Sequence, residues 1–414
     1  MHAHSGWTSD PLPLAVCALG VAQITAWGTS YYCLGVLAGP IVAETGWSAS
    51  LVYFGFTVAL LAMGAFSPLA GRAIDRHGAR ALMALGTVLV SLGLYALSLV
   101  RSEAAYLAVW AFLGLGMRLC LYDAAFVALV QTVPSRGRLA ISYLTLFGAF
   151  ASTVFWVAGH YANQAVGWRQ TLVLFAAINL LVCLPLNWLG LARRERADAQ
   201  AAAAAAVSPS QDGPPLQGST RLVAMGLFAL VMSLNGFVFG VVTVQLVPLL
   251  EAAGLATAAA VWVASLKGFA QFAGRVVEIL FGRNLRAITV ARIAIGALPV
   301  SFLLLALAGG NLKLVLAFTL LMGASQGVIT IVRGAVPLAL FGAAGYGAVL
   351  GLLATPILVV NAASQTLFAM IVEGWGWQAA QGVLLATSAA SWLAIELMAR
   401  WYERSRPRAR APGA

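Results

Sequence analysis

The chain has 414 residues, of which 61% are hydrophobic and only 9% are charged. A single soluble core of this length cannot bury so large an apolar share, so the composition excludes an ordinary soluble protein and indicates lipid as the solvent. The net charge of +11 could suggest a nucleic-acid partner, but the basic residues lie in connections between apolar segments, which argues against one.

The apolar residues fall into segments of about twenty residues, the length with which a helix crosses a hydrocarbon core about 30 Å thick. The alternating hydrophobic and polar residues that a membrane β-barrel requires do not occur over such lengths. The sequence therefore predicts an all-α membrane protein with twelve transmembrane helices. Their predicted bounds are about 13–38, 48–70, 81–99, 104–130, 140–163, 168–191, 220–250, 257–281, 285–308, 312–335, 345–370 and 376–400.

The basic residues predict the orientation of these helices. Arginines gather after the second, fourth, sixth and eighth predicted helices and again at 400–410, whereas the other connections carry little beyond Arg101, Arg169 and Lys313. Basic loops stay in the cytoplasm, so we expect both termini to be cytoplasmic, which requires an even number of crossings. The first apolar run lacks a small-residue cleavage site, so we expect it to be retained, in what we take to be a bacterial inner membrane.

A change of composition divides the chain into two halves. Residues 193–219 combine a charged run, an alanine tract and a Pro/Ser/Gly-rich stretch, which is typical of a linker. We predict a first six-helix bundle at 1–192 and a second at 220–414, the latter with a basic cytoplasmic tail. The two halves share a short pattern, because Gly71–Asp75 and Gly274–Glu278 both read Gly-Arg-x-x-acid. Such repetition indicates a duplicated fold.

A second shared pattern is a Gly-Trp pair. Gly167 and Trp168 precede the sixth predicted helix, and Gly376 and Trp377 precede the twelfth. Tryptophan at such positions is typical of an anchor at the membrane interface. We therefore expect these side chains to position helices rather than to bind a ligand.

The connection after the second helix, residues 71–80, reads Gly-Arg-Ala-Ile-Asp-Arg-His-Gly-Ala-Arg. Glycines allow a tight turn, and a carboxylate here can stabilise the positive N-terminus of a helix from the other half. The run resembles the signature loop of the major facilitator superfamily, G-x-x-x-D-R-x-G-x-R, at every defining position. The resemblance implies two pseudo-symmetric bundles and a loop that locks the cytoplasmic side against helix eleven. The loop residues that we expect to act in gating are Gly71, Asp75, Arg76, Gly78 and Arg80.

Ionisable residues within the predicted helices are few, and each costs about 2.5–3.5 kcal/mol on insertion scales. Arg118 lies near the middle of the fourth helix and Lys267 near the middle of the eighth, one in each half. A buried cation without a carboxylate beside it is neutralised most readily by a ligand, so the pair indicates an anionic substrate between the halves. The alternative is that Lys267 forms a structural ion pair with Asp123 or Glu278.

On the eighth helix, successive steps of about 100° place Gln271 and Glu278 on the face of Lys267 and Arg275 about 80° away. On the fourth helix, the same steps place Tyr122 beside Arg118 and Asp123 about 140° away. We therefore expect Asp123 to lie apart from Arg118. By resemblance to the superfamily, its partner would be Arg76 or Arg80 of the signature loop, which adds Asp123 to the gating residues.

A finer resemblance is to the monocarboxylate and oxalate/formate branch of the superfamily. It is carried by Gly46-Trp47-Ser48 before the second helix and by Pro68 within it, and it implies that Arg275 contacts substrate. The chain departs from that branch at 282–284, which lacks the acidic and glycine residues of a second signature loop, and it lacks the lysines of helices one and eleven. The predicted substrate-binding residues are Arg118, Lys267, Arg275, Gln271, Tyr122, Tyr31, Tyr32, Gln23, Asn235 and Asn361.

These features predict a secondary transporter that works by alternating access on a small, monocarboxylate-like organic anion, coupled to protons or to a counter-anion. The alternative on the same fold is proton-coupled efflux of drugs, although the fifth helix lacks the Gly-Pro signature of drug antiporters. A membrane sensor or an enzyme is less compatible, since no output domain, nucleophile-base pair, metal cluster or Walker motif is present. We expect no cofactor, a monomer, and lipid and a small molecule as the partners.

Overall fold

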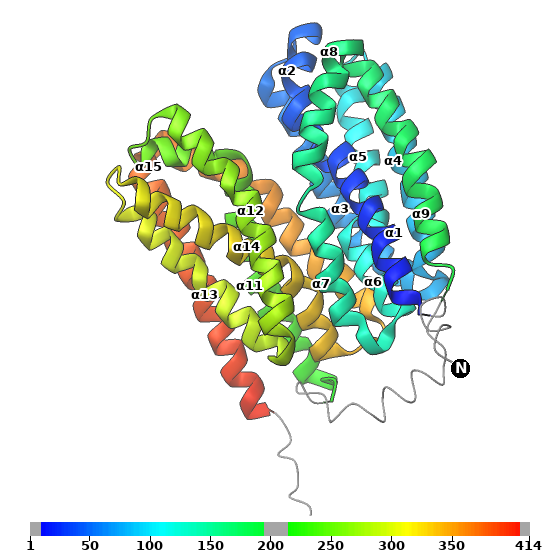
Figure 1. Ribbon diagram of the computed structural model, residues 1–414, viewed down its shortest axis with the longest axis vertical. Coiled ribbons are helices and arrows are strands. Elements are labelled where there is room, and N and C mark those ends of the chain that lie inside the picture. Colours follow the sequence, from blue (N-terminus) through cyan, green and yellow to red (C-terminus); the bar gives the residue numbers. More distant parts are fainter. Residues whose placement is uncertain (1–9, 194–213, 406–414) are drawn as a thin grey trace, which may run out of the picture.

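The computed structural model describes residues 10–193 and 214–405, and these residues are almost entirely helical (Figure 1). The first half contains α1 (Pro11–Ala26), α2 (Leu34–Thr45), α3 (Ala49–His77), α4 (Ala79–Leu99), α5 (Glu103–Cys120), α6 (Tyr122–Thr132), α7 (Gly137–Gly148), α8 (Ala151–Ile178) and α9 (Leu184–Gly190). The second half contains α11 (Gly218–Ala252), α12 (Thr257–Phe281), α13 (Ala287–Ala306), α14 (Leu312–Phe341) and α15 (Tyr346–Ser405). Two π-helical turns, η1 (Trp27–Tyr31) and η3 (Asn179–Cys183), and two short 3₁₀ turns, η2 (Pro134–Arg136) and η4 (Gly282–Asn284), join some of them.

The helix lengths agree with the predicted crossings. Within the described chain, 9 helical stretches are long and apolar enough to cross a membrane. Two of these, Pro134–Gly190 and Tyr346–Arg404, have 57 and 59 residues and so suffice for two crossings each. Helix α12 has 25 residues but carries buried charges that lower its hydropathy. The fold is thus an all-α membrane fold, consistent with twelve transmembrane helices.

The two longest stretches bend at equivalent glycines. Gly167 has φ 79° and ψ 165°, and Gly376 has φ 79° and ψ 171°, a conformation that residues with a side chain rarely adopt. Each is the glycine of a Gly-Trp pair, at the turn between the last two crossings of its half. The repeated sequence therefore encodes a repeated backbone turn.

The helices form two bundles that lie side by side (Figure 1). The core of the second bundle is built from residues between Ala224 and Tyr402 alone, whereas the two apolar clusters of the first bundle include some residues of α14 and α15. Large apolar side chains also point outward, for example Leu181 at 76% and Trp375 at 74% exposure. An outward apolar surface on a chain of this composition is what lipid contact requires.

The bundles meet at one end of the molecule and diverge toward the other (Figure 1). The end at which they meet is the one where α9 ends and α11 begins, and we call it the linker end. Most of the predicted linker, residues 194–213, and most of the basic tail, residues 406–414, lie outside the described residues.

The signature loop makes the first contact between the bundles at the linker end. Asp75, near the end of α3, accepts hydrogen bonds from the backbone N–H groups of Gly347 (2.9 Å) and Ala348 (2.7 Å) in the first turn of α15. This carboxylate satisfies two N–H groups that a helix N-terminus leaves unpaired, and its charge is favourable there. The predicted contact with helix eleven is confirmed.

The second Gly-Arg-x-x-acid segment makes the reciprocal contact. Glu278, near the end of α12, accepts hydrogen bonds from Ser142 (3.0 Å) and from Arg138 (3.3 Å), both on α7 of the first bundle. Arg138 also donates to the carbonyls of Gly282 (3.0 Å) and Leu285 (2.7 Å). The acid of the repeated pattern therefore bonds to a helix of the opposite bundle in both halves.

The α3–α15 contact depends on glycine at both positions. A Cβ added to Gly347 would lie 2.7 Å from the Gly71 carbonyl oxygen, and one added to Gly71 would collide with the Gly347 carbonyl. Overpacking of this kind costs about 1–3 kcal/mol. We therefore expect Gly71→Ala to shift the molecule toward a state with the linker end open. By contrast, Gly226→Ala adds a methyl group where nothing lies within 4 Å and is the matched control.

Spin labels at His77 and Ala344, which are exposed at the linker end of the first and second bundle, would measure this shift by double electron–electron resonance. The exposed Cys17 is first replaced by serine. The distance distribution should lengthen in Gly71→Ala and stay unchanged in Gly226→Ala. Identical distributions in both variants would show that the glycine contact does not hold the linker end closed.

Candidate functional site

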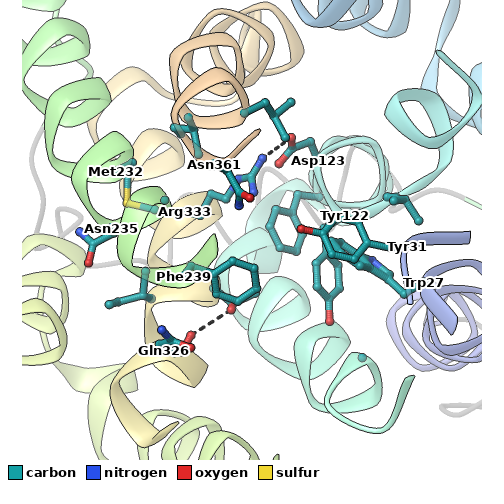
Figure 2. Close-up of a pocket in the computed structure, with 18 of the residues that line it drawn as sticks. Trp27, Tyr31, Tyr122, Asp123, Met232, Asn235, Phe239, Gln326, Arg333 and Asn361 are labelled. Atoms are coloured by element: carbon teal, nitrogen blue, oxygen red, sulfur yellow. Dashed lines mark hydrogen bonds and ion pairs between the residues drawn. The ribbon is translucent and has the colours of Figure 1, made fainter. Parts of the chain in front are cut away.

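A cavity lies between the two bundles, with an empty volume of about 1270 Å³ that is partly open to solvent. Figure 2 shows Trp27, Tyr31 and Tyr122 of the first bundle on one side and Met232, Asn235, Phe239 and Gln326 of the second on the other. Eight of the ten predicted substrate-binding residues line it, namely Tyr31, Tyr32, Arg118, Tyr122, Asn235, Gln271, Arg275 and Asn361. The structure thus brings together residues from predicted helices of both halves.

The fourth predicted helix is broken at its centre. Leu121 has an extended backbone (φ −82°, ψ −168°) and separates α5 from α6, so helical steps cannot be counted from Arg118 to Asp123. As a result, Arg118 Nη1 forms an ion pair with Asp123 Oδ2, and both side chains are buried. The prediction that Asp123 lies apart from Arg118 is wrong, because it assumed a continuous helix.

A second arginine reaches the same carboxylate from the other bundle. Arg333 of α14 places Nη2 2.7 Å from Asp123 Oδ2, an ion pair visible in Figure 2. The prediction that Arg76 or Arg80 pairs with Asp123 is therefore also wrong. Arg80 instead donates to the Trp188 carbonyl (2.7 Å) and stacks on its ring.

Arg333 is not among the predicted site residues, because the tenth helix is longer than expected. It runs to Phe341 rather than to residue 335, so Arg333 lies about 12 Å inside the helix end instead of next to it. The fourth and tenth crossings occupy corresponding places in the two halves. Asp123 is consequently held between arginines of two equivalent helices, and the ion pair with Arg333 joins the bundles at the cavity.

Arg275 is the cavity cation that has no carboxylate partner among the described residues. It is 4% exposed, and it donates to the carbonyl oxygens of Gly327 (3.2 Å) and Thr145 (2.7 Å). Carbonyl oxygens orient the guanidinium but leave its charge uncompensated. The positive charge that the sequence suggested for the eighth helix is therefore present at Arg275.

Lys267 does not line the cavity. Its Nζ lies 5.9 Å from the ring centroid of Phe239, which does line it, and no ion pair of Lys267 occurs within the described chain. The alternative structural pairs are absent too, because Asp123 bonds to Arg118 and Arg333 and Glu278 bonds to Arg138. Arg275, rather than Lys267, is thus the cation of α12 that lines the cavity.

Gln23 lies behind the cavity wall rather than in it. Its side-chain amide donates to the Cys120 carbonyl (2.7 Å), which terminates α5 at the break, and it accepts from Trp27 Nε1 (3.1 Å). Gln23 is 0% exposed. It therefore stabilises the break in the fourth helix and positions a cavity tryptophan, instead of meeting substrate.

The hydrogen bonds of Gln23 should contribute to stability. In Gln23→Met, an apolar residue of similar shape leaves the Cys120 carbonyl without this donor, a loss of about 1–3 kcal/mol. We expect a thermal unfolding temperature several degrees lower than that of the wild type in detergent. Gln164→Met is the control, because Gln164 is exposed and bonds only to His160 within the described chain. Equal unfolding temperatures would exclude the proposed role.

The aromatic side of the cavity is positioned by π-helical turns. Trp27 and Tyr31 begin and end η1, and their ring centroids are 4.7 Å apart. Asn179, the first residue of the second π-helical turn, donates to Thr29 (2.8 Å) and so ties η3 to η1. π-helical turns occur frequently at functional sites because the extra residue redirects side chains. The sequence gives no signal for either turn.

The ionisable side chains around the cavity carry a net positive formal charge. Its ionisable lining residues within the described chain are Arg118, Arg275 and Arg333 as cations, Asp123 as the carboxylate, and three tyrosines. The arginines therefore exceed the carboxylate by two formal charges. In a site of low dielectric, such an excess favours an anionic ligand.

Comparison with known proteins identifies the family of the chain. A family model described as Major Facilitator Superfamily matches residues 19–311, more than half of the chain. The chain belongs to the major facilitator superfamily. No curated protein matches its sequence.

Solved structures share the superfamily fold. The human organic anion transporter MFSD10 (TETRAN) is 17% identical, with a TM-score of 0.74 over 94% of this chain and 100% of that one. The transporter FucP in the outward conformation, for which a variant structure is described as the E. coli fucose:proton symporter, is 13% identical, with a TM-score of 0.67 over 94% and 99%. The proton:xylose symporter XylE, bound to 6-bromo-6-deoxy-D-glucose, is 14% identical, with a TM-score of 0.68 over 94% and 96%. At these identities the likeness concerns the fold alone.

Proposed function

We propose that this protein is a secondary active transporter that moves an organic anion by alternating access, coupled to protons or to a counter-anion. The observation that carries the proposal is Arg275, a buried guanidinium at the cavity whose bonds within the described chain are to carbonyl oxygens only. A buried charge of this kind is costly until a ligand compensates it. We propose Arg275, rather than Lys267, as the principal site for the anionic group of the substrate.

The other predicted site residues have places in this proposal. Gln271, Asn235 and Asn361 line the second bundle's side of the cavity, and Tyr31, Tyr32 and Tyr122 line the first bundle's side. Efflux of cationic drugs, the competing function, would place a cation beside three arginines and one carboxylate, which is electrostatically unfavourable. MFSD10, which shares the fold, is an organic anion transporter, in agreement with the proposed class.

The conformational cycle follows from the two contacts at the linker end. We take this end to be cytoplasmic by the positive-inside rule, in a bacterial inner membrane, so the described state has its cytoplasmic side closed. The halves at 1–192 and 220–414 would rock about the cavity. Opening would release Asp75 from the N-terminus of α15 and Glu278 from α7.

Asp123 is the carboxylate at which coupling would occur. Both arginines bond to its Oδ2, and its Oδ1 is buried without a hydrogen-bond partner in the described chain. An anionic substrate competes with Asp123 for Arg333, whose exposure of 25% leaves it accessible from the cavity. Binding of the substrate would thus weaken an ion pair that joins the bundles. A proton on Asp123 or a counter-anion would have the same effect in the return step.

Counterflow in proteoliposomes tests the function. Vesicles with purified protein are loaded with formate, acetate, lactate, oxalate or benzoate, and uptake of the same labelled anion is measured. Vesicles with Arg275→Gln, vesicles without protein, and uptake of fucose and of a cationic dye are the controls. We expect at least one carboxylate to exchange with wild-type protein only. Exchange of sugar or dye without any carboxylate would contradict the proposal.

A further inference from the structure

The cavity walls also indicate which uncharged groups the substrate carries beside its anionic group. This inference rests on the proposed function. Aromatic rings form the first bundle's wall. The centroid of Trp27 lies 4.7 Å from that of Tyr31 and 5.0 Å from that of Tyr122, and Tyr122 stacks on Phe126 at 5.3 Å with an angle of 16° between the ring planes. All four side chains line the cavity. Such a surface suits a flat apolar body, because aromatic pairs gain energy beyond that of area burial.

The opposite wall carries amides whose hydrogen-bonding capacity is not used. Gln326 is 5% exposed, and neither its amide nitrogen nor its amide oxygen has a partner within the described chain. Asn235, also 5% exposed, donates to Ser391 (2.6 Å), but its amide oxygen is likewise unpaired there. Buried polar groups are normally hydrogen-bonded, and these unpaired atoms are available to bond to a ligand in the cavity. Figure 2 shows both amides opposite the aromatic wall.

The lining of the cavity argues in the same direction. It combines Arg275 with the aromatic rings of the first bundle and the amides of the second. A formate or acetate ion bound at Arg275 would leave the aromatic wall and the two amides without contact. The monocarboxylate resemblance therefore predicts the charged group of the substrate but not the rest of the molecule.

We propose that the substrate is an aromatic carboxylate whose ring carries a hydroxyl or an N–H group. The carboxylate binds at the arginines, the ring lies against Trp27 and Tyr122, and the polar substituent bonds to Gln326 and Asn235. The carboxylate and the polar substituent thereby meet groups that are uncompensated within the described chain, and the ring meets the aromatic wall. A site built around a hydrogen bond also rejects analogues that lack it, since its own polar atoms would then stay unpaired.

Thermal stabilisation of the purified protein, titrated with a graded set of acids, tests the proposal. The set consists of acetate, cyclohexanecarboxylate, benzoate and 4-hydroxybenzoate, which adds a saturated ring, aromaticity and a hydroxyl in turn. We expect benzoate to bind about tenfold tighter than cyclohexanecarboxylate, and 4-hydroxybenzoate about tenfold tighter than benzoate. Acetate should bind most weakly.

Variants test which wall of the cavity produces the preference for the hydroxyl and which produces the preference for the aromatic ring. Gln326→Leu should lower the preference for the hydroxyl, to which Asn235 can still bond, and keep the preference for the aromatic ring. Trp27→Leu should lower the preference for the ring and keep that for the hydroxyl, and Trp27→Phe should retain both. Tyr122→Leu replaces Trp27→Leu if the latter does not fold, and Gln164→Leu at the exposed surface is the control.

The outcomes separate the two proposals. If acetate binds as tightly as 4-hydroxybenzoate and Arg275→Gln abolishes binding, the anion site stands and the aromatic substrate class is wrong. The class is also wrong if the hydroxyl preference is undiminished in Gln326→Leu. If no acid stabilises the protein, or if Arg275→Gln binds all of them unchanged, the proposed function fails together with this inference.

Discussion

Arg275→Gln is expected to lower kcat/KM for the transported anion at least about 100-fold, equivalent to about 2.7 kcal/mol. Glutamine preserves a donor for one of the carbonyl oxygens of Gly327 and Thr145 but removes the charge that the anion would meet. Loss of one partner of a buried charge pair commonly costs about 2–5 kcal/mol, so the expected decrease is within the usual range. The measurement is initial counterflow rate against substrate concentration in proteoliposomes.

Two further variants make this result specific. Arg275→Lys keeps the charge but cannot satisfy both carbonyls and a carboxylate in the same geometry, so an intermediate rate is expected. Arg101→Gln removes an exposed arginine at the end of the molecule opposite the linker end, and it should leave transport unchanged. Normal gel filtration with normal transport in Arg275→Gln would exclude this arginine from the site.

Asp123→Asn is expected to have the largest effect on the protein itself. The substitution leaves the buried Arg118 and the partly buried Arg333 close together without their common carboxylate. Breaking a buried ion pair by removal of one partner costs about 3–5 kcal/mol. We expect a marked decrease in the thermal unfolding temperature and the loss of transport.

A double-mutant cycle with Arg333→Gln distinguishes repulsion between Arg118 and Arg333 from general misfolding. Arg333→Gln alone leaves the Arg118–Asp123 pair intact and should mainly weaken the contact between the bundles. Asp123→Asn with Arg333→Gln should be more stable than Asp123→Asn alone, because the repulsion between the arginines is relieved. If the two substitutions destabilise additively, the three groups do not act as one unit.

The sequence predicted the helices well because their signals are local. Runs of apolar residues specify the crossings, and the Gly-Trp pairs and the Gly-Arg-x-x-acid segments mark turns that both halves share. The contact of Asp75 with helix eleven was expected from the resemblance of residues 71–80 to the superfamily's signature loop. The electrostatic rule alone indicated only that this carboxylate could stabilise the N-terminus of some helix in the other half.

The site was predicted less completely, because its geometry depends on breaks and packing. Leu121 adopts an extended conformation without glycine or proline to signal it, and this one residue brings Asp123 to Arg118. The predicted end of the tenth helix was too early, so the prediction placed Arg333 near the helix end rather than well inside it. Phe126 and Phe239 line the cavity, but an aromatic residue in a membrane helix looks the same in the sequence whether it meets lipid, core or ligand.

Lys267 shows the limit of counting charges. Its position near the middle of a helix was correct, yet which side of α12 faces the cavity depends on how the bundles pack. Gln23 shows the converse, because a polar residue at membrane depth suggested ligand binding and instead compensates the helix break at Cys120. Both errors come from tertiary packing, which helical periodicity alone does not specify.

The sign of the charge that the cavity accepts is tested most directly by a carboxylic acid and its own primary amide. The carboxylate that binds most tightly to the purified protein is compared with this amide by equilibrium titration, in the wild type and in Arg275→Gln. We expect the acid to bind at least about tenfold tighter than the amide in the wild type, and the ratio to fall to about one in Arg275→Gln. An amide that binds the wild type as tightly as the acid would contradict a cavity built for an anion.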